Sequence, residues 1–417
     1  MPKNIVLLLD GTSNEISHKR SNILRLYGVL EKSDAQLVYY DPGVGTFGAD
    51  HAWSRAWRKL VEIWGLATGW GLDSNVKEAY RFLAEHYDHG KDREDGERDS
   101  IYIFGFSRGA YTARVLAGFI HATGLIEPRN LNLLDYAYRA YKRVGESERQ
   151  GAFAEVRLYE RILDPDRPPI RMLGLFDTVA SVIESGRFGP RLKSHAFTRN
   201  NRSVESVAHA VAIDEKRTMF RPQLWPAGQE YWGNPFNDAQ AKPQEVDEVW
   251  FAGAHGDVGG GYPEKESGLC KIPLVWMIER AMACGLKFQP RSVNSLVLGR
   301  NSDKYVAPDS LAAPHRTMTF WWSLVEFLPR RKPKDSSRPS WFGISLPLFE
   351  RRAIPEGAKI HPSLVERKNK LQEWSENIPN RHEIATEPQG QEKRGAKLGR
   401  PKNNLSKTGS NARLPPE

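Results

Sequence analysis

The strongest structural signal in this chain is Ile101-Tyr-Ile-Phe-Gly-Phe-Ser-Arg-Gly-Ala110, an apolar run that ends in a Gly-x-Ser-x-Gly turn. An alanine-rich stretch follows directly and predicts a helix over residues 110–125. A strand that turns this sharply into a helix lifts a serine hydroxyl clear of a sheet, as in a nucleophile elbow. Side chains at Gly105 and Gly109 would collide with the neighbouring strand and helix. The turn therefore predicts Ser107 as a nucleophile.

Further apolar runs occur along the chain, each ending in a polar or glycine-rich turn. They are Ile5–Leu9, Gln36–Tyr40, Met172–Phe176 and Val249–Ala254. Near-continuous apolar strands that alternate with helical stretches predict a mostly parallel sheet with helices on both faces. The predicted fold class is therefore α/β, of the α/β-hydrolase type. Because ligands of such sheets bind where the strands end, we expect one edge to collect Asp10, Asp41, Ser107, Asp177 and His255.

A serine nucleophile needs a base within hydrogen-bond reach, and that base needs a carboxylate to orient it. We expect His255 to be the base, because it follows a strand and lies in a glycine-rich loop; His361 is the alternative. Two acids are candidates. Asp177 closes a strand, and Asp214 ends the stretch His209-Ala-Val-Ala-Ile-Asp214, which we expect to lie at a helix end. In this fold class the acid lies between serine and histidine along the chain.

The oxyanion that forms during acyl transfer needs backbone N–H donors beside the nucleophile. The predicted helix begins just after Ser107, so the N–H of Arg108 is the first candidate. The turn Asp10-Gly11-Thr12 follows the first strand, and the N–H of Gly11 or Thr12 is the second.

Two other sequence patterns are candidates for a cofactor site or a metal site. The run Gly43-Val-Gly-Thr-Phe-Gly48 matches a dinucleotide fingerprint, but no acidic residue ends a following strand about 20 residues on. Carboxylates at Asp10, Asp41 and Asp257 would suit a divalent cation, but they lack a metal-ligand spacing. We therefore expect neither a cofactor nor a metal.

Charge and composition restrict the possible partners of the 417-residue chain. Its net charge is +9, and +5 of this lies in residues 390–417, so the positive field is largely that of a tail. We expect no specific nucleic-acid partner. The chain has two cysteines and neither a cleavable leader nor an apolar run long enough to span a membrane. It is expected to be cytoplasmic as synthesised, with leaderless export as a possible route.

Three segments follow from the composition. Residues 1–290 are expected to form the catalytic domain. Residues 291–382 are expected to form a lid or a membrane-interfacial segment, because the aromatic run Met318–Leu328, which contains Trp321 and Trp322, precedes the basic loop 329–334. Residues 383–417 are rich in Gly, Pro, Asn and Lys and are expected to be a disordered basic tail.

Several of these motifs together resemble the type VI secretion lipase effector family, first class. The matching stretches include Leu8-Leu-Asp-Gly-Thr12, Tyr39-Tyr-Asp-Pro-Gly-Val-Gly-Thr46, Gly69-Trp-Gly-Leu-Asp-Ser-Asn-Val76, Gly105-Phe-Ser-Arg-Gly-Ala110, Phe176-Asp-Thr-Val179, His209-Ala-Val-Ala-Ile-Asp-Glu215, Phe251-Ala-Gly-Ala-His-Gly-Asp-Val-Gly-Gly-Gly-Tyr262 and Ile360-His-Pro-Ser363. The resemblance implies a Ser–Asp–His acyl hydrolase of glycerophospholipids, with Ser107 as nucleophile and His255 as base. Family spacing favours Asp214 over Asp177 as the acid.

The expected function is therefore serine hydrolysis of esters, with phospholipid acyl esters as the substrate class and peripheral membrane contact as a possible partner interaction. Two alternatives stay open at this point: a soluble carboxylesterase or thioesterase, and a non-catalytic module that binds anionic lipid or nucleic acid. The sequence leaves the oligomeric state open.

Overall fold

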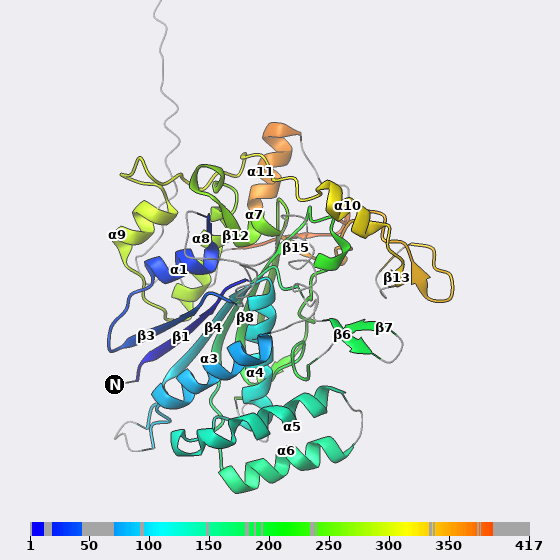
Figure 1. The fold of residues 1–417 in the computed structure, drawn as a ribbon. Helices are drawn as coiled ribbons and strands as arrows, with labels where there is room; N and C mark the ends of the chain where they lie inside the picture. The colour runs from blue at the N-terminus through cyan, green and yellow to red at the C-terminus, as the bar shows by residue number, and fades with distance from the viewer. Residues whose placement is uncertain are drawn as a thin grey trace, which may run out of the picture.

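The computed structural model describes residues 2–11, 19–43, 71–91, 96–146, 150–179, 183–186, 189–192, 195–233, 238–239, 241–332, 336, 338–372, 375 and 377–386. An eight-stranded parallel sheet forms its centre (Figure 1). In spatial order its strands are β3 (Gln36–Asp41), β1 (Asn4–Leu9), β4 (Ser100–Phe106), β5 (Ile170–Phe176), β8 (Val204–Ala212), β11 (Glu245–Phe251), β15 (Lys359–Ile360) and β16 (Glu383–Ile384).

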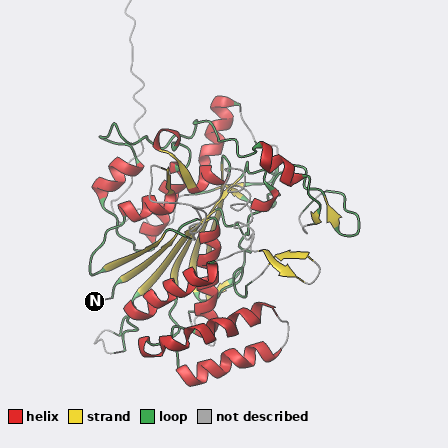
Figure 2. Cartoon of the chain, viewed as in Figure 1, coloured by secondary structure: helices red, strands yellow, loops and turns green. Residues whose placement is uncertain are grey.

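Helices cover both faces of this sheet, as Figure 2 shows. One face carries α3 (Leu72–His86) and α4 (Arg108–Thr123), with α5 (Leu134–Glu146) and α6 (Gln150–Leu163) packed against α4. The other face carries α1 (Asn22–Val29), α8 (Lys271–Ala283) and the π-helical turn η5 (Val293–Val297). The structure is therefore α/β with a parallel, two-sided sheet, as the strand pattern predicts.

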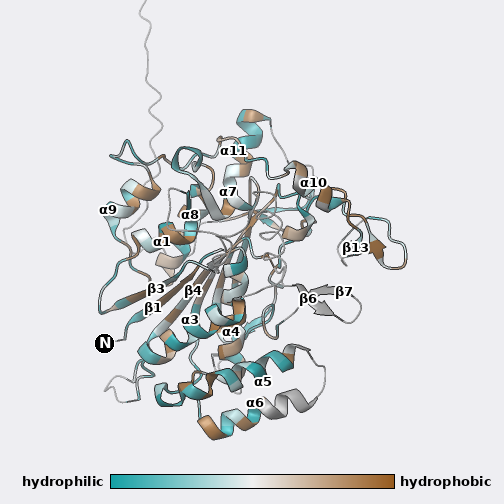
Figure 3. Cartoon of the chain, in the orientation of Figure 1, coloured by the Kyte–Doolittle hydropathy of each residue, from teal (hydrophilic) through white to brown (hydrophobic). Residues whose placement is uncertain are grey.

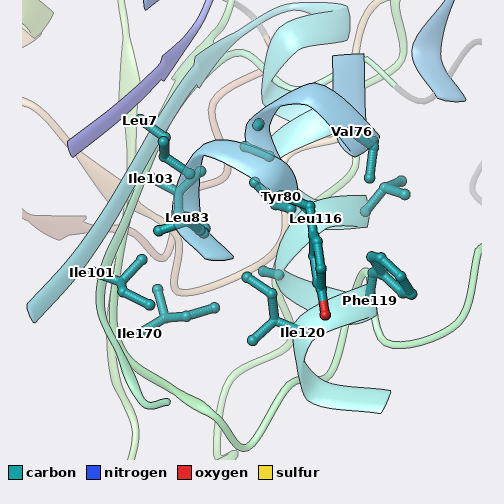
Figure 4. Close-up of a cluster of buried hydrophobic side chains, with 14 of the residues drawn as sticks. Leu7, Val76, Tyr80, Leu83, Ile101, Ile103, Leu116, Phe119, Ile120 and Ile170 are labelled. Atoms are coloured by element: carbon teal, nitrogen blue, oxygen red, sulfur yellow. The ribbon is translucent and has the colours of Figure 1, made fainter. Parts of the chain in front are cut away.

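Alternation along the apolar strands builds a core on each face. In β1, Ile5, Leu7 and Leu9 belong to one buried cluster, while Val6 and Leu8 belong to the cluster on the opposite face. Figure 4 shows the first cluster, in which Leu7 and Ile103 of the sheet meet the side chains of α3 and α4. Figure 3 shows that the helices covering the sheet carry both apolar and polar residues.

The connectivity of the sheet reverses at β1. The chain passes from β1 to β3 on one side and then returns to place β4 on the other side. Leu9, the last residue of β1, pairs with Asp41 of β3 and with Gly105 of β4. In open parallel sheets, ligands bind in the crevice at such a reversal. The turn that carries Ser107 begins at this position.

Shorter elements complete the described chain. They are β2 (Lys19–Ser21), paired with β12 (Gly260–Pro263), the hairpin β6 (Ile183–Gly186) and β7 (Gly189–Leu192), and the pair β9 (Glu230–Tyr231) and β10 (Lys242–Pro243). The C-terminal part adds α9 (Pro290–Ser292), α10 (Phe320–Glu326), the hairpin β13 (Arg330–Arg331) and β14 (Ile344–Ser345), and α11 (Pro362–Leu371). Short helical turns are η2 (Pro128–Leu133), η3 (Thr218–Phe220), α7 (His255–Gly259) and η4 (Glu264–Glu266).

Two expectations from the sequence differ from this arrangement. The stretch that ends at Asp214 was expected to end a helix, but it is the buried strand β8, followed by a turn. Its alanines favour a helix when isolated, whereas burial between β5 and β11 selects a strand.

The C-terminal segments also differ from their predicted boundaries. Residues 359–360 and 383–384 extend the central sheet, and Val293 and Val297 belong to its core. The sheet therefore crosses the boundary expected near residue 290, and the tail predicted from residue 383 begins with strand β16. A two-residue strand leaves no periodicity for the sequence to reveal. Residues 387–417 lie outside the described chain.

Candidate active site

A sharp turn between β4 and α4 carries Ser107. The residue has φ 58° and ψ −121°, a conformation that is costly for a residue with a side chain. A Cβ atom on Gly105 would lie 2.4 Å from the carbonyl oxygen of Gly109, and one on Gly109 would lie 2.2 Å from that of Leu9. The collisions predicted from the sequence are confirmed. Only glycine fits at positions 105 and 109.

Three backbone hydrogen bonds fix this elbow in place. The N–H of Ser107 donates to the carbonyl of Phe176 at the end of β5 (3.0 Å). The carbonyl of Ser107 accepts from the N–H of Tyr111 in the first turn of α4 (3.3 Å) and from the N–H of Val179 (3.4 Å). The strained turn is therefore held by the neighbouring strand and by the loop that follows it.

His255 lies directly against the serine. It begins α7, just past the end of β11, and its Nε2 is 2.8 Å from Oγ of Ser107, although 148 positions separate the two along the chain. The rings of Phe106 and Phe220 lie 4.7 and 4.9 Å from the imidazole. The ring is only 7% exposed. This packing excludes water from most of the imidazole and restricts its orientation.

Asp177 lies on the other side of the same imidazole. Its Oδ2 is 2.5 Å from Nδ1 of His255, and its side chain is fully buried. An imidazole whose Nδ1–H donates to a carboxylate presents the lone pair of Nε2 to the serine hydroxyl. Ser107, His255 and Asp177 thus form a continuous hydrogen-bonded chain across the ends of three strands.

Arg352 also holds the Asp177 carboxylate. Its Nη1 donates to Oδ1 (2.6 Å) and its Nη2 to Oδ2 (2.9 Å). The same guanidinium donates to the carbonyls of Ala212 and Phe220. Burial opposes ionisation of Asp177, but the Arg352 charge and the His255 hydrogen bond hold the pKa of this carboxyl well below its usual range. No sequence motif marks Arg352, so its contact with Asp177 was not predictable from the sequence.

Asp214 lies elsewhere. Its Oδ2 accepts from the N–H of Gly253 (2.8 Å) and its Oδ1 from the hydroxyl of Ser375 (2.9 Å). These bonds tie the end of β8 to the backbone just before the His255 turn. The preference for Asp214 that came from the resemblance is thus not matched by a contact with the imidazole, whereas the strand-end position of Asp177 is.

The oxyanion candidates differ in their surroundings. Arg108 is the first residue of α4, so its backbone N–H lies at the helix N-terminus next to Ser107. The N–H of Gly11 already donates to Oδ1 of Asp10 (2.7 Å), whose carboxylate also accepts from Ser21 and Tyr40. The N–H of Gly11 therefore has a hydrogen-bond partner within its own turn. Thr12 lies outside the described residues.

His361, the alternative base, has a different environment. It stacks on Phe251 with ring centres 4.7 Å apart, and its Nδ1 lies 2.9 Å from the hydroxyl of Ser363 at the start of α11. Burial lowers the pKa of His361 to about 3. This histidine is the N-cap residue of α11 and packs against Phe251 at the end of β11.

The acidic groups considered as metal ligands have separate partners. Asp257 accepts from the N–H of Ala254 (2.9 Å) and pairs with Nδ1 of His315 (2.6 Å). Asp41 accepts from the N–H of Gly43 (2.8 Å). Within the described ranges, no three His, Cys, Asp or Glu side chains are grouped so as to hold a metal ion. Most of the glycine run 43–48 lies outside those ranges.

A helix from the C-terminal part lies over the histidine side of the site. The indole of Trp322 in α10 contacts the ring of Phe220 edge-on, with centres 5.6 Å apart. The guanidinium of Arg217 lies 3.8 Å from the centre of the Phe220 ring. A chain of aromatic contacts therefore runs from His255 through Phe220 to α10.

The chain matches, over residues 3–280, the family model described as the catalytic domain of the Tle1-like type VI secretion phospholipase effectors. It belongs to this family. The resemblance seen in the sequence motifs is confirmed, and the Tle1-like domain contains Ser107, Asp177 and His255 but not Arg352.

Other proteins are similar to this Tle1-like chain over part of their length. The uncharacterized protein YEL023C of Saccharomyces cerevisiae is 33% identical over 231 residues, which cover 52% of this chain and 32% of the yeast protein. An uncharacterized protein from Pseudomonas aeruginosa (21% identity, TM-score 0.37) is matched over 70% of this chain and 47% of that one. The Tle1 effector bound to the VgrG spike (20% identity, TM-score 0.33) is matched over 64% and 52%. The chain thus spans about a third of the yeast relative.

The described part of the Tle1-like chain has no helix that is both long and apolar enough to cross a membrane.

Proposed function

We propose that this chain is a serine hydrolase of lipid esters, with phospholipid acyl esters as its substrate class. The observation that carries the proposal is the hydrogen-bonded series Ser107–His255–Asp177, with 2.8 Å and 2.5 Å between successive groups. The description of the family as phospholipase effectors supports the choice of substrate class.

In the first half of the proposed reaction, Oγ of Ser107 attacks the ester carbonyl carbon while Nε2 of His255 takes the hydroxyl proton. Asp177 stabilises the imidazolium that forms and keeps its Nδ1–H directed at the carboxylate. The N–H of Arg108 is proposed to donate to the oxyanion, with the N–H of Gly11 or Thr12 as the second donor. His255 then gives its proton to the departing alcohol, and the acyl group stays on Ser107.

The second half returns the enzyme to its starting state. Water attacks the acyl carbon as His255 takes one of its protons, and the released Oγ of Ser107 recovers that proton when the fatty acid leaves. The apolar rings of Phe106 and Phe220 around the imidazole keep bulk water away from the developing charge. This strengthens the hydrogen bonds on which the transition state depends.

The test is covalent labelling with a fluorophosphonate, which phosphonylates an activated serine with loss of fluoride. We expect the wild-type chain to be labelled and Ser107→Ala to be unlabelled. The matched control is Ser292→Ala, whose hydroxyl donates only to Gln289 and which is expected to label like wild type. A folded wild-type chain that takes no label contradicts the proposal.

The substrate class is tested by incubating the labelling-competent chain with phospholipid vesicles and measuring released fatty acid by mass spectrometry, with Ser107→Ala as the blank. Release from vesicles supports phospholipid esters. Turnover of only soluble short-chain esters or thioesters would reject the lipid part of the proposal and keep the serine chemistry.

A further inference from the structure

Exposed apolar side chains are concentrated in one segment of the described chain. Of its thirteen exposed large hydrophobic residues, eight lie between positions 320 and 346. We call these eight the 320–346 surface: Phe320, Leu324, Phe327, Leu328, Trp341, Phe342, Ile344 and Leu346. Trp341 is 82% exposed and Phe342 is 91% exposed. A soluble protein rarely exposes large aromatic side chains to this extent unless they meet a partner.

Two elements carry this surface, and both project from the body of the molecule. They are α10 and the hairpin β13–β14, which Figure 1 shows extending away from the central sheet. Figure 3 shows apolar colouring along the same projection. Phe320 and Leu324 lie four positions apart in α10 and so share one side of the helix.

Backbone hydrogen bonds define the turn that carries Trp341 and Phe342. Trp341 and Ile344 exchange backbone hydrogen bonds of 2.8 and 2.9 Å, and the N–H of Lys332 donates to the carbonyl of Gly343 (2.8 Å). These bonds close the turn that presents Trp341 and Phe342. The two rings lie 5.7 Å apart at their centres, so they form one exposed apolar pair.

The base of the projection is fixed beside the candidate site. The buried carboxylate of Glu326, at the end of α10, accepts from the N–H and the hydroxyl of Thr218 (2.9 and 2.5 Å). Thr218 begins the turn η3, which ends at Phe220, and Phe220 lies between Trp322 and His255. The 320–346 surface is therefore attached to the same turn that packs on the catalytic imidazole.

The charge of the segment identifies the partner. Residues 320–346 contain five Lys or Arg and two Asp or Glu, and Arg330-Arg331-Lys332 stand together at the start of the hairpin. One of the two acids is Glu326, whose carboxylate is buried against Thr218 and adds little to the surface field. Exposed Trp and Phe beside a run of cationic residues match the apolar boundary and the phosphates of a bilayer.

We propose that the 320–346 surface docks this chain on a lipid bilayer that carries anionic headgroups. Trp341 and Phe342 enter the headgroup–acyl boundary, the net positive charge of residues 320–346 favours anionic headgroups, and α10 lies at the interface with Trp322 in contact with Phe220 beside the site. The inference rests on the proposed function for its meaning, since docking brings the lipid substrate to Ser107. The binding itself does not require catalysis.

The test uses the full chain carrying Ser107→Ala, so that vesicles stay intact, and measures co-sedimentation with two kinds of vesicle. One is phosphatidylcholine alone and the other contains about 30% phosphatidylserine. We expect the Trp341→Ser/Phe342→Ser variant to lose at least about tenfold in partitioning onto the anionic vesicles. The matched control is Leu158→Ser/Ile162→Ser on α6, which removes two comparably exposed apolar side chains (50% and 64%) and is expected to bind normally.

Two further readouts separate the possible outcomes. In the chain with Ser107 intact, we expect Trp341→Ser/Phe342→Ser to keep kcat/KM for a soluble short-chain ester and to lose vesicle hydrolysis in proportion to binding. Equal vesicle binding by this variant and wild type overturns the proposal. So does size-exclusion chromatography in which the substitution converts a dimer into a monomer while vesicle binding is unchanged. Vesicle binding that depends on the two rings, with no hydrolysis by the wild-type chain, would reject the proposed function and keep the docking surface.

Discussion

Asp177 has more charged and polar partners than any other group described at the site. His255, both terminal nitrogens of Arg352 and the N–H of Ala212 (3.0 Å) all bond to its two oxygens. A carboxylate withdrawn from water is stable only when such donors replace the solvent, and losing one partner of a buried ion pair typically costs about 3–5 kcal/mol. The same donors fix where the carboxylate points, and hence how the imidazole is turned.

The first prediction concerns the identity of the acid. Asp177→Asn is expected to lower kcat by about 10³–10⁴, because the amide does not hold the Nδ1–H tautomer of His255. Asp214→Asn is the matched control, since an amide oxygen still accepts from the N–H of Gly253, and kcat is expected to stay within about threefold of wild type. Ester turnover of the two purified variants is the measurement. The reverse pattern would assign the acid to Asp214.

The second prediction concerns Arg352 as a positioning residue. Arg352→Gln is expected to lower kcat by roughly 10² while KM for a soluble ester stays similar, because the substitution releases Asp177 and leaves the binding surface intact. Loss of the positive charge also raises the pKa of Asp177, so the acid limb of the kcat/KM profile is expected to move to higher pH.

The controls for Arg352 are Arg352→Lys, which keeps the charge and is expected to recover part of kcat, and a urea titration that confirms folding. A pH profile with an unmoved acid limb in Arg352→Gln would show that the guanidinium supports the structure without acting on Asp177.

At this scale, the predictable residues are those that a local sequence pattern marks. The elbow glycines mark Ser107, and the glycine-rich turn after a strand marks His255. The acid stayed open between Asp177, which was expected at a strand end, and Asp214, which the family resemblance favoured. Only tertiary geometry tells which carboxylate reaches the imidazole. Arg352 lies 175 positions from Asp177 and had no local signal at all.

At the scale of elements, the strand–turn–helix unit around Ser107 depends on close backbone contact. The helix α4 begins immediately after the serine, and its first turn lies against the end of β1. Such proximity leaves no room for a methyl group at Gly109.

The third prediction follows from this contact. Gly109→Ala is expected to destabilise the fold by about 3 kcal/mol, because the new Cβ would lie 2.2 Å from a carbonyl oxygen that cannot move without its strand. Gly28→Ala in α1 is the control: its nearest neighbour would be Cδ1 of Leu296 at 3.4 Å, and better helix propensity is expected to stabilise it by up to about 1 kcal/mol. Urea-induced unfolding measures both. Equal stability of the two variants would contradict the steric account.

The five apolar runs along the chain were predictable as strands, and each of them overlaps a strand of the central sheet. Strand β8 was missed because its alanine-rich second half carries a helical preference that only its buried position overrides. Strands β15 and β16 have two residues each and exist only because the sheet edge is there to pair with them.

At the scale of the whole molecule, residues beyond 290 join the central sheet and the candidate site. They supply Arg352 to the site, two strands to the sheet and α10 to the aromatic contacts over His255. The boundary expected near residue 290 followed a change in composition. Composition carries no information on strand pairing between segments this far apart. The pairing of β15 and β16 with the sheet was therefore not predictable from the sequence.

The fourth prediction concerns acid stability. Burial lowers the pKa of His121 to about 4 and the pKa of His361 to about 3. Burial also lowers the pKa of His209. Below the pH where unfolded histidines titrate, about 6.5, the unfolded chain takes up protons that the native chain refuses. The free energy of unfolding is therefore expected to fall as the pH decreases from about 6.5 toward 4, by up to about 1.4 kcal/mol per pH unit for each histidine.

Two carboxyls act in the opposite direction, because burial raises the pKa values of Asp41 and Asp257 and the native chain then binds protons earlier. Urea titrations between pH 7 and 5 measure the net slope. His361→Gln is expected to reduce that slope by up to about 1.4 kcal/mol per pH unit, which is the contribution of one proton. A slope that does not change in this variant would show that His361 takes no part.

The hydrogen bonds from Arg352 to Asp177 join two parts of the chain that are synthesised at different times. The stretch matched by the family model ends at residue 280 and already contains the serine, the histidine and the acid. A nascent chain of that length would enclose a carboxylate whose cationic partner had not yet left the ribosome. If the proposed function holds, full turnover is acquired late in translation, and a gene product truncated before codon 352 is expected to lose at least about 10² in kcat although it retains Ser107, Asp177 and His255.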